Sequence, residues 1–121
     1  DIWGGDIDPA AVELARHNAE LAGVEDCIRF EVADAGKFHR DSEYGQLVTN
    51  PPYGERLLEK KEAEDLYRMF GAALRDLPPK WRVLVLSSHT EFERCFGRPA
   101  DKKRKLYNGM IKCDLFMYGN V

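Results

Sequence analysis

The sequence has few cysteines, no long apolar run and no excess of positive charge. Its three cysteines, Cys27, Cys95 and Cys113, lie far apart and form no CxxC pair. This argues against both a disulfide framework and a zinc site, and it suits a reducing compartment. No apolar run approaches the roughly 20 residues that a membrane span needs, and no export leader is visible. We therefore expect a cytoplasmic protein with no metal site and no membrane contact.

The charge balance argues against binding of nucleic acid through an overall positive charge. The 18 Lys and Arg against 21 Asp and Glu give a net charge of −3, so contact with a polyanion must be local or come from another domain. The 121 residues, 44% hydrophobic and 32% charged, have room for one folded domain. Because Asp1 already lies in what reads as a strand, we expect a piece of a longer protein.

Strand-like and helix-like segments alternate along the chain. Asp8 and Thr90 are expected to cap the helices that follow them, and Gly23 and Gly97 to end them. The pattern predicts an α/β fold with a mostly parallel sheet, helices on both faces and a C-terminal antiparallel hairpin. The expected strands are 2–6, 28–33, 45–49, 81–86, 102–106 and 110–118, and the expected helices are 9–22, 62–77 and 90–96, with Leu66, Met69, Phe70, Ala73 and Leu77 as the buried stripe of the second helix.

Polar residues follow four of the expected strands at their carboxyl ends. These are Asp6, Asp34, Asn50 and the run Ser87-Ser88-His89. Ligands of such sheets bind at the carboxyl ends of the strands. Any one of these residues alone is more simply a turn former, but four at one edge predict a ligand site. A Ser and His adjacent in sequence lack the geometry of a nucleophilic pair, which argues against a hydrolase.

The tetrapeptide Asn50-Pro51-Pro52-Tyr53 is suited to a planar amine such as the exocyclic nitrogen of a purine. The Asn50 carboxamide oxygen and the Pro51 carbonyl can accept its two N–H groups, draw the nitrogen toward tetrahedral geometry and free its lone pair for attack. The prolines stiffen the loop and preorganise these acceptors. Tyr53 offers a flat face for an unstacked base. The simpler alternative is a rigid turn with a packed Tyr.

Residues at the first two strand ends suit a nucleoside. The Asp6 carboxylate can bind both hydroxyls of a ribose, as acidic residues do in dinucleotide sites, and Ile7 can pack on an adenine face. Asp34 can accept from an adenine amino group, while the amide of Ala35 is offered to a ring nitrogen. Asp8 we assign to helix capping instead.

These segments together resemble the S-adenosylmethionine-dependent RNA methyltransferases. Within them the chain is similar to the RlmL-like (UPF0020, THUMP-associated) ribosomal RNA guanine-N2 methyltransferases. The tetrapeptide Asn-Pro-Pro-Tyr alone is shared with DNA adenine and protein glutamine methyltransferases. Its extension over residues 54–57 and the segment 105–113 limit the resemblance to the RlmL-like group. The segments that carry it are Gly5-Asp-Ile-Asp-Pro9, the helix 11–23, Asp34-Ala35, Asn50-Pro-Pro-Tyr-Gly-Glu-Arg-Leu57 and Lys105-Leu-Tyr-Asn-Gly-Met-Ile-Lys-Cys113.

The resemblance implies a Rossmann-like class I methyltransferase fold, with residues 1–121 as the C-terminal part of the catalytic domain. The family's first strand and glycine-rich loop would precede Asp1. It implies S-adenosylmethionine as cofactor, bound by Asp6, Ile7, Asp34 and Ala35, and RNA, ribosomal RNA above all, as partner. Asn50, Pro51 and Tyr53 would hold a guanine whose N2 attacks the methyl group. Substrate contacts are expected at Pro52, Tyr53 and Arg56.

Other functions stay open from the sequence. The alternatives to transfer onto guanine N2 are transfer onto adenine N6 or a protein glutamine, and a non-catalytic module that binds RNA or a partner. A strand without its neighbour exposes its edge and predicts self-association, and we expect the chain alone to bind the cofactor weakly and to be inactive.

The basic runs Lys60-Lys61 and Lys102–Lys105 are either phosphate contacts or solvated residues, and the sequence leaves this open.

Overall fold

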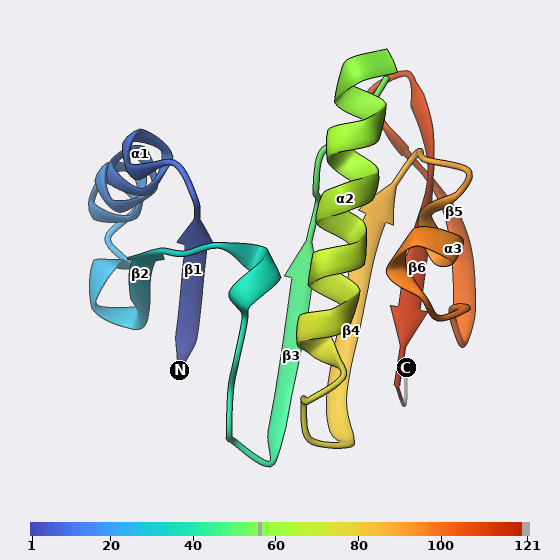
Figure 1. Ribbon diagram of the computed structural model, residues 1–121. Helices are drawn as coiled ribbons and strands as arrows, with labels where there is room; N and C mark the ends of the chain where they lie inside the picture. The colour runs from blue at the N-terminus through green and yellow to red at the C-terminus, as the bar shows by residue number, and fades with distance from the viewer. Residues whose placement is uncertain (56, 120–121) are drawn as a thin grey trace.

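The computed structural model describes residues 1–55 and 57–119, and the strands in these ranges form two sheets (Figure 1). The smaller sheet pairs β1 (Ile2–Asp6) with β2 (Ile28–Val32) in parallel. Helix α1 (Pro9–Leu21) connects these two strands and packs on them. The short 3-10 turns η1 (Glu25–Cys27) and η2 (Ala35–Lys37) flank β2.

The larger sheet has the strand order β3-β4-β6-β5. β3 (Tyr44–Thr49) and β4 (Lys80–Ser87) are parallel, while β6 (Ile111–Tyr118) runs antiparallel to both β4 and β5 (Lys102–Asn108). Figure 1 shows α2 (Leu57–Leu74) and the short α3 (Phe92–Phe96) on one face of this sheet.

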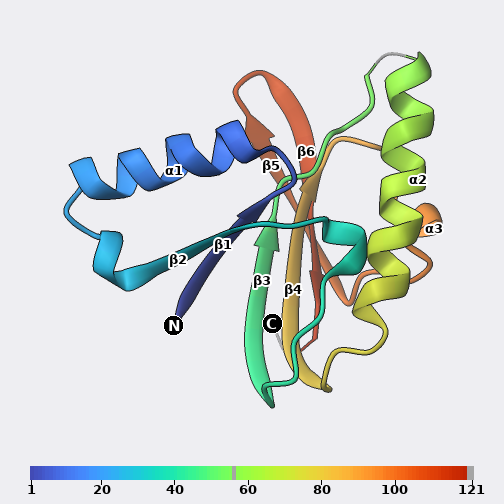
Figure 2. The same ribbon diagram turned by 60° about the vertical axis from the view of Figure 1, so that its left-hand side comes forward.

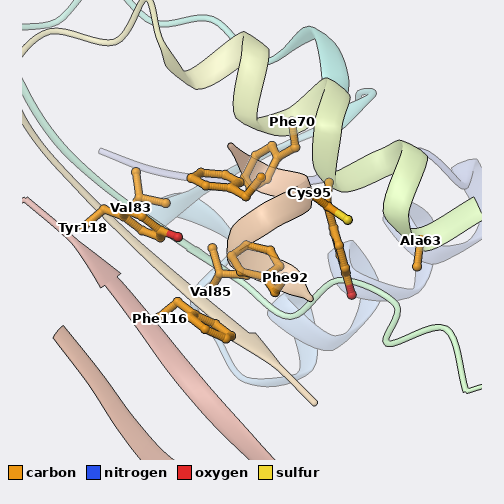
Figure 3. Packing of buried hydrophobic residues seen from close by; sticks show 10 residues of the cluster. Ala63, Phe70, Val83, Val85, Phe92, Cys95, Phe116 and Tyr118 are labelled. Atoms are coloured by element: carbon orange, nitrogen blue, oxygen red, sulfur yellow. The ribbon is translucent and has the colours of Figure 1, made fainter. Parts of the chain in front are cut away.

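The hydrophobic core lies between these two helices and the larger sheet (Figure 3). Val83 and Val85 of β4 are in register with Tyr118 and Phe116 of β6, so these side chains point from adjacent strands to the same face. Phe92 of α3 packs against Phe116 with ring centroids 4.7 Å apart. A dense aromatic cluster thus fixes both helices on the sheet.

Helix α2 differs from the sequence prediction in its bounds and in its buried face. It spans Leu57–Leu74 rather than 62–77, because Leu77 lies in a turn that precedes the Pro78-Pro79 pair. Its buried face contains Ala63, Tyr67 and Phe70, whereas Met69 is 49% exposed. The expected stripe was therefore wrong at Met69, while Leu77 packs against the core from the turn after the helix. Ala63 and Tyr67 occupy core positions that a search for large apolar residues passes over.

The expected helix ends are confirmed in three of four cases. The Asp8 carboxylate accepts from the Ala10 amide at 2.9 Å, and Gly23 and Gly97 have φ of +72° and +89°. The expected Thr90 cap is wrong, since Glu91 holds the capping position of α3 and makes no side-chain cap there. The amide of Glu91 instead donates to the ring Nδ1 of His89 at 3.0 Å.

The sequence predicts a single sheet, whereas the strands of the described residues form two separate sheets. β1 pairs only with β2, and β3 pairs only with β4, so each presents one unpaired edge. Self-association through these edges stays a prediction, which sedimentation at increasing concentration would test. Among the described helices, none combines the length and the apolarity that a membrane crossing requires.

Candidate active site

The residues singled out at the strand ends gather at one edge of the molecule. Figure 2 shows β1, β3 and β4 ending on the same side, together with the start of α1, the loop between β3 and α2, and the turn of the β5–β6 hairpin. This edge carries Asp6, the last residue of β1, with Ile7 after it, then Asp34 and Ala35 after β2, and residues 50–55 after β3. Arg56, the other expected substrate contact, lies outside the described residues.

Asp6 and Asp34 are held by the local backbone. The amide of Ala33 donates to the Asp6 carbonyl at 2.9 Å and joins the two strand ends just beyond their ladder. The Asp6 carboxylate accepts from the amide of Asp8 at 2.9 Å, and the Asp34 carboxylate accepts from the amide of Gly36 at 2.9 Å. These Asx turns orient both carboxylates before any ligand is present.

The surroundings of Asp6 suit a nucleoside. Asp6 is exposed and is followed by Ile7, whose side chain is 68% exposed. Ala35 is also exposed, and Asp34 is half-buried beside it. An acidic acceptor next to an uncovered apolar side chain is the combination that binds a ribose diol and a purine face in nucleotide sites.

The loop after β3 presents Asn50 to solvent. Asn50 is exposed, and the next residue, Pro51, is half-buried. Tyr53 is half-buried, and its hydroxyl accepts from the Asn108 side-chain amide at 3.0 Å. Burial raises the pKa of Tyr53, and the side chains of Asn108 and Asn50 oppose this rise. Tyr53 is therefore a neutral phenol near neutral pH, and it lies close enough to the exposed Asn50 for the Asn50 side chain to affect its pKa.

A buried tyrosine anchors this loop to helix α2. The Tyr67 hydroxyl donates to the Pro52 carbonyl and also lies 3.2 Å from the Ser87 hydroxyl oxygen. Tyr67 is fully buried, and this burial raises its pKa. At Gly54 the backbone has a φ of +70°, and a Cβ would lie 2.7 Å from the Cα of Lys60. Only glycine fits there, so the loop is fixed from two directions.

His89 supports this anchor and has no free ring nitrogen for catalysis. Its Nδ1 accepts from the Glu91 amide at 3.0 Å, so the ring proton is on Nε2, which donates to a Glu64 carboxylate oxygen at 2.9 Å. The Ser87 hydroxyl accepts from the backbone amide of His89 at 3.1 Å rather than from its ring. Ser87 and His89 are thus not a nucleophile and base pair.

Helix α2 connects the two halves of the site. A Cβ on Gly36, in the turn that follows Asp34, would lie 3.0 Å from Met69 Cε of α2, so this turn packs directly on the helix. Two residues earlier in α2, Tyr67 holds the loop of Asn50. One rigid element therefore sets the spacing between the strand end that carries Asp34 and the loop that carries Asn50.

A cavity of about 560 Å³ opens between the loop and the first turns of α2. Its volume is in the range of small-molecule sites, and Pro52 and Tyr53 form one wall. The lining also includes Gly54, Glu55, Glu59, Glu62, Ala63 and Leu66. The carboxylates make this side of the loop acidic. Within residues 1–55 and 57–119, no group of three or more His, Cys, Asp or Glu side chains could hold a metal ion.

Sequence reasoning missed Tyr67 and Asn108. Tyr67 lies seven residues before Leu74 on the buried face of α2 and is indistinguishable in sequence from a packing aromatic. Asn108 was given no role from the sequence, yet its side chain contacts Tyr53, 55 residues away. No local pattern reveals such a contact.

Comparison with solved structures assigns the class of the fold. SMU.472, a candidate methyltransferase solved in complex with SAH, is 44% identical, with a TM-score of 0.93. The match covers 100% of this chain and 32% of the SMU.472 chain. A structure from Listeria monocytogenes (str. 4b F2365), described as a predicted N6-adenine-specific DNA methylase, covers 98% of this chain and 30% of its own, with a TM-score of 0.87 and 43% identity. The fold is that of the class I methyltransferases, as the sequence predicted.

Comparison of sequences then gives the family. The RMKL-like methyltransferase domain (UPF0020) matches residues 1–116, and the chain belongs to this family. Two relatives each align with 97% of the chain. YpsC of Bacillus subtilis (strain 168), named as a candidate RNA methyltransferase, is 46% identical, and ribosomal RNA large subunit methyltransferase K/L of Shewanella baltica (strain OS185) is 41% identical. The chain spans 30% and 16% of their respective lengths.

Proposed function

We propose that this chain transfers a methyl group from S-adenosylmethionine to the exocyclic N2 of a guanine in RNA. The observation that carries the proposal is the loop of Asn50. Asn50 is exposed at the carboxyl end of β3, and the backbone of its loop is fixed by Tyr67 and Gly54. The loop lies on the side of the molecule where β1 and β3 end (Figure 2), and Asp6 is the last residue of β1.

The cofactor part of the site fits S-adenosylmethionine. Asp6 is suited to the ribose hydroxyls, Ile7 to the adenine face, and Asp34 with the amide of Ala35 to the adenine edge. The cofactor supplies an electrophilic methyl group on a sulfonium centre. SMU.472 was solved with SAH, the demethylated form of that cofactor, and it covers all of this chain.

The acceptor part of the site explains how a weak nucleophile would react. The guanine N2 lone pair is delocalised into the ring, and acceptance of both N–H groups by Asn50 and the Pro51 carbonyl localises it on nitrogen. Both acceptors are held before the base arrives, so little reorganisation is needed at the moment of reaction. Tyr53, a neutral phenol with a raised pKa, serves as a stacking face and not as a base. The proton leaves readily once the nitrogen has become cationic.

The RNA substrate is supported by the names of the relatives. One is named as an RNA methyltransferase and another acts on ribosomal RNA, and we propose ribosomal RNA in the cytoplasm as the target. Because the chain matches only 30% and 16% of these relatives, we also propose that it works as part of the catalytic domain of a longer protein. The activity experiments below therefore use the full-length protein.

Adenine N6 is the competing acceptor, because the same loop suits any planar amine and the Listeria structure is described as an adenine methylase. Nucleosides from total RNA of a strain that lacks the gene should have lost one N2-methylguanosine when analysed by mass spectrometry. The wild-type gene should restore it, and a gene encoding Asn50→Ala should not. Loss of a methylated adenosine, or of no nucleoside at all, would overturn the proposal.

A further inference from the structure

The β5–β6 hairpin concentrates the positive charge of an otherwise acidic chain. The segment 102–112 contains five Lys or Arg and no Asp or Glu, while the chain as a whole has a net charge of −3. Side chains at its turn are uncovered, with Tyr107 68% exposed and Met110 98% exposed. Lysines on an edge strand such as β5 also prevent pairing with other sheets, but an exposed aromatic ring among them adds a surface on which a nucleic-acid base can stack.

The exposed aromatic ring has lysines on both sides. Tyr107 is in register with Lys112 on the neighbouring strand, so the two side chains point to the same face of the hairpin. Lys105, two residues before Tyr107 on the same strand, also points to this face, where it is in register with the half-buried Asp114 of β6. Both lysines are exposed. Further along the strand, Lys103 pairs with Glu93 at 3.0 Å and belongs to the fold.

The hairpin turn is attached to the acceptor loop. Asn108, the last residue of β5, donates to the Tyr53 hydroxyl at 3.0 Å from the face of the hairpin opposite to that of Tyr107, so the loop and the Tyr107 face meet around the turn. On the α2 side, the same loop borders the cavity that Glu55, Glu59 and Glu62 line. Phosphate groups are repelled by those three carboxylates, which the exposed Lys60 and Lys61 of α2 offset in part. The hairpin, with no carboxylate in 102–112, therefore offers a polyanion the more favourable approach to Asn50.

We propose that the exposed turn of this hairpin binds the RNA strand beside the target nucleotide, with a neighbouring base stacked on Tyr107 and phosphates held by Lys105 and Lys112. This inference rests on the proposed function, because it names the RNA contact of the same site. Stacking on an aromatic side chain combined with basic contacts to the backbone is how proteins bind single-stranded RNA without reading its sequence.

Salt-dependent binding of a fluorescein-labelled, single-stranded oligoribonucleotide of mixed sequence tests this surface in the full-length protein. Lys105→Ala/Lys112→Ala should reduce the slope of log affinity against log salt concentration by about 1.4, the value for two lost phosphate contacts. Tyr107→Ala should weaken binding about tenfold, and Tyr107→Phe should bind normally. The matched control Lys80→Ala/Arg82→Ala removes two exposed charges at the opposite end of the sheet and should leave the slope unchanged.

Unchanged affinity and slope in both hairpin variants would overturn the proposal and would leave the exposed turn as a surface for a protein partner. A methylation assay on the same preparations separates this failure from failure of the proposed function. Hairpin-dependent RNA binding without methylation of any RNA would support the surface and contradict the enzyme assignment. Normal methylation and normal RNA binding by the hairpin variants would contradict the proposed RNA-binding surface and support the enzyme assignment.

Discussion

Replacement of Asn50 by Ala is expected to lower kcat for methyl transfer by about 10²–10³-fold. This is the effect of removing one preorganised group that stabilises charge developing in a transition state. Because Asn50 lies on the loop after β3, whereas the proposed ribose and adenine contacts follow β1 and β2, the affinity for S-adenosylmethionine should not change. Single-turnover kinetics with excess enzyme, together with calorimetry of cofactor binding, measure both quantities.

Two further variants make the Asn50 result specific. Asn50→Asp keeps an acceptor oxygen at the same position and should lose less activity than Asn50→Ala. Asn18→Ala removes an exposed carboxamide from α1 and should leave kcat unchanged. If Asn50→Ala retained the wild-type kcat, the carboxamide would have no part in activating the amine.

Replacement of Tyr67 by Phe is expected to reduce both stability and kcat. The ring packs edge-on against Phe92, with centroids 4.9 Å apart, and a phenylalanine preserves that contact. Loss of the hydroxyl leaves the Pro52 carbonyl and the Ser87 hydroxyl without this partner, which costs about 1–3 kcal/mol for buried groups. Because Pro52 lies two residues from Asn50, we also expect kcat to fall about tenfold as the acceptor geometry loosens.

Tyr118→Phe is the matched control for this positioning role. Tyr118 is equally buried, and its hydroxyl donates to the Arg98 carbonyl at 2.9 Å. Both variants should lose stability in urea unfolding, because Tyr118→Phe removes one hydrogen bond of a buried tyrosine and Tyr67→Phe removes two, to the Pro52 carbonyl and the Ser87 hydroxyl. Only Tyr67→Phe should lower kcat. An equal kcat in the two variants would show that Tyr67 contributes to the core and not to the placement of the loop.

The sequence predicted the parts of this site that depend on local chemistry. Asp6, Asp34 and Asn50 each follow a strand, and parallel strands place their carboxyl ends at one edge whatever the details of packing. Helix signals at Asp8, Gly23 and Gly97 are equally local, because capping depends on a few neighbouring backbone groups. These features required only the order of residues along the chain.

The features that the sequence did not predict are contacts between distant segments. Tyr67 holds Pro52, 15 residues earlier in the chain, and Asn108 contacts Tyr53 across 55 residues. Neither pairing has a periodic signal, since each depends on how α2 and the hairpin pack on the sheet. The Thr90 cap failed because α3 begins at Phe92, one residue later than a Thr90 cap requires, so that Glu91 holds the capping position.

Methylation of RNA in which inosine replaces guanine tests the central claim most directly. Inosine lacks only the 2-amino group, so the shape of the base and the RNA backbone are retained while the proposed nucleophile is absent. Transcripts of the target region made with guanosine should accept radioactive methyl groups from S-adenosylmethionine in the presence of the full-length protein, and inosine transcripts should accept none. Equal incorporation into both transcripts would contradict the account, since the methyl group would then be transferred to an atom other than guanine N2.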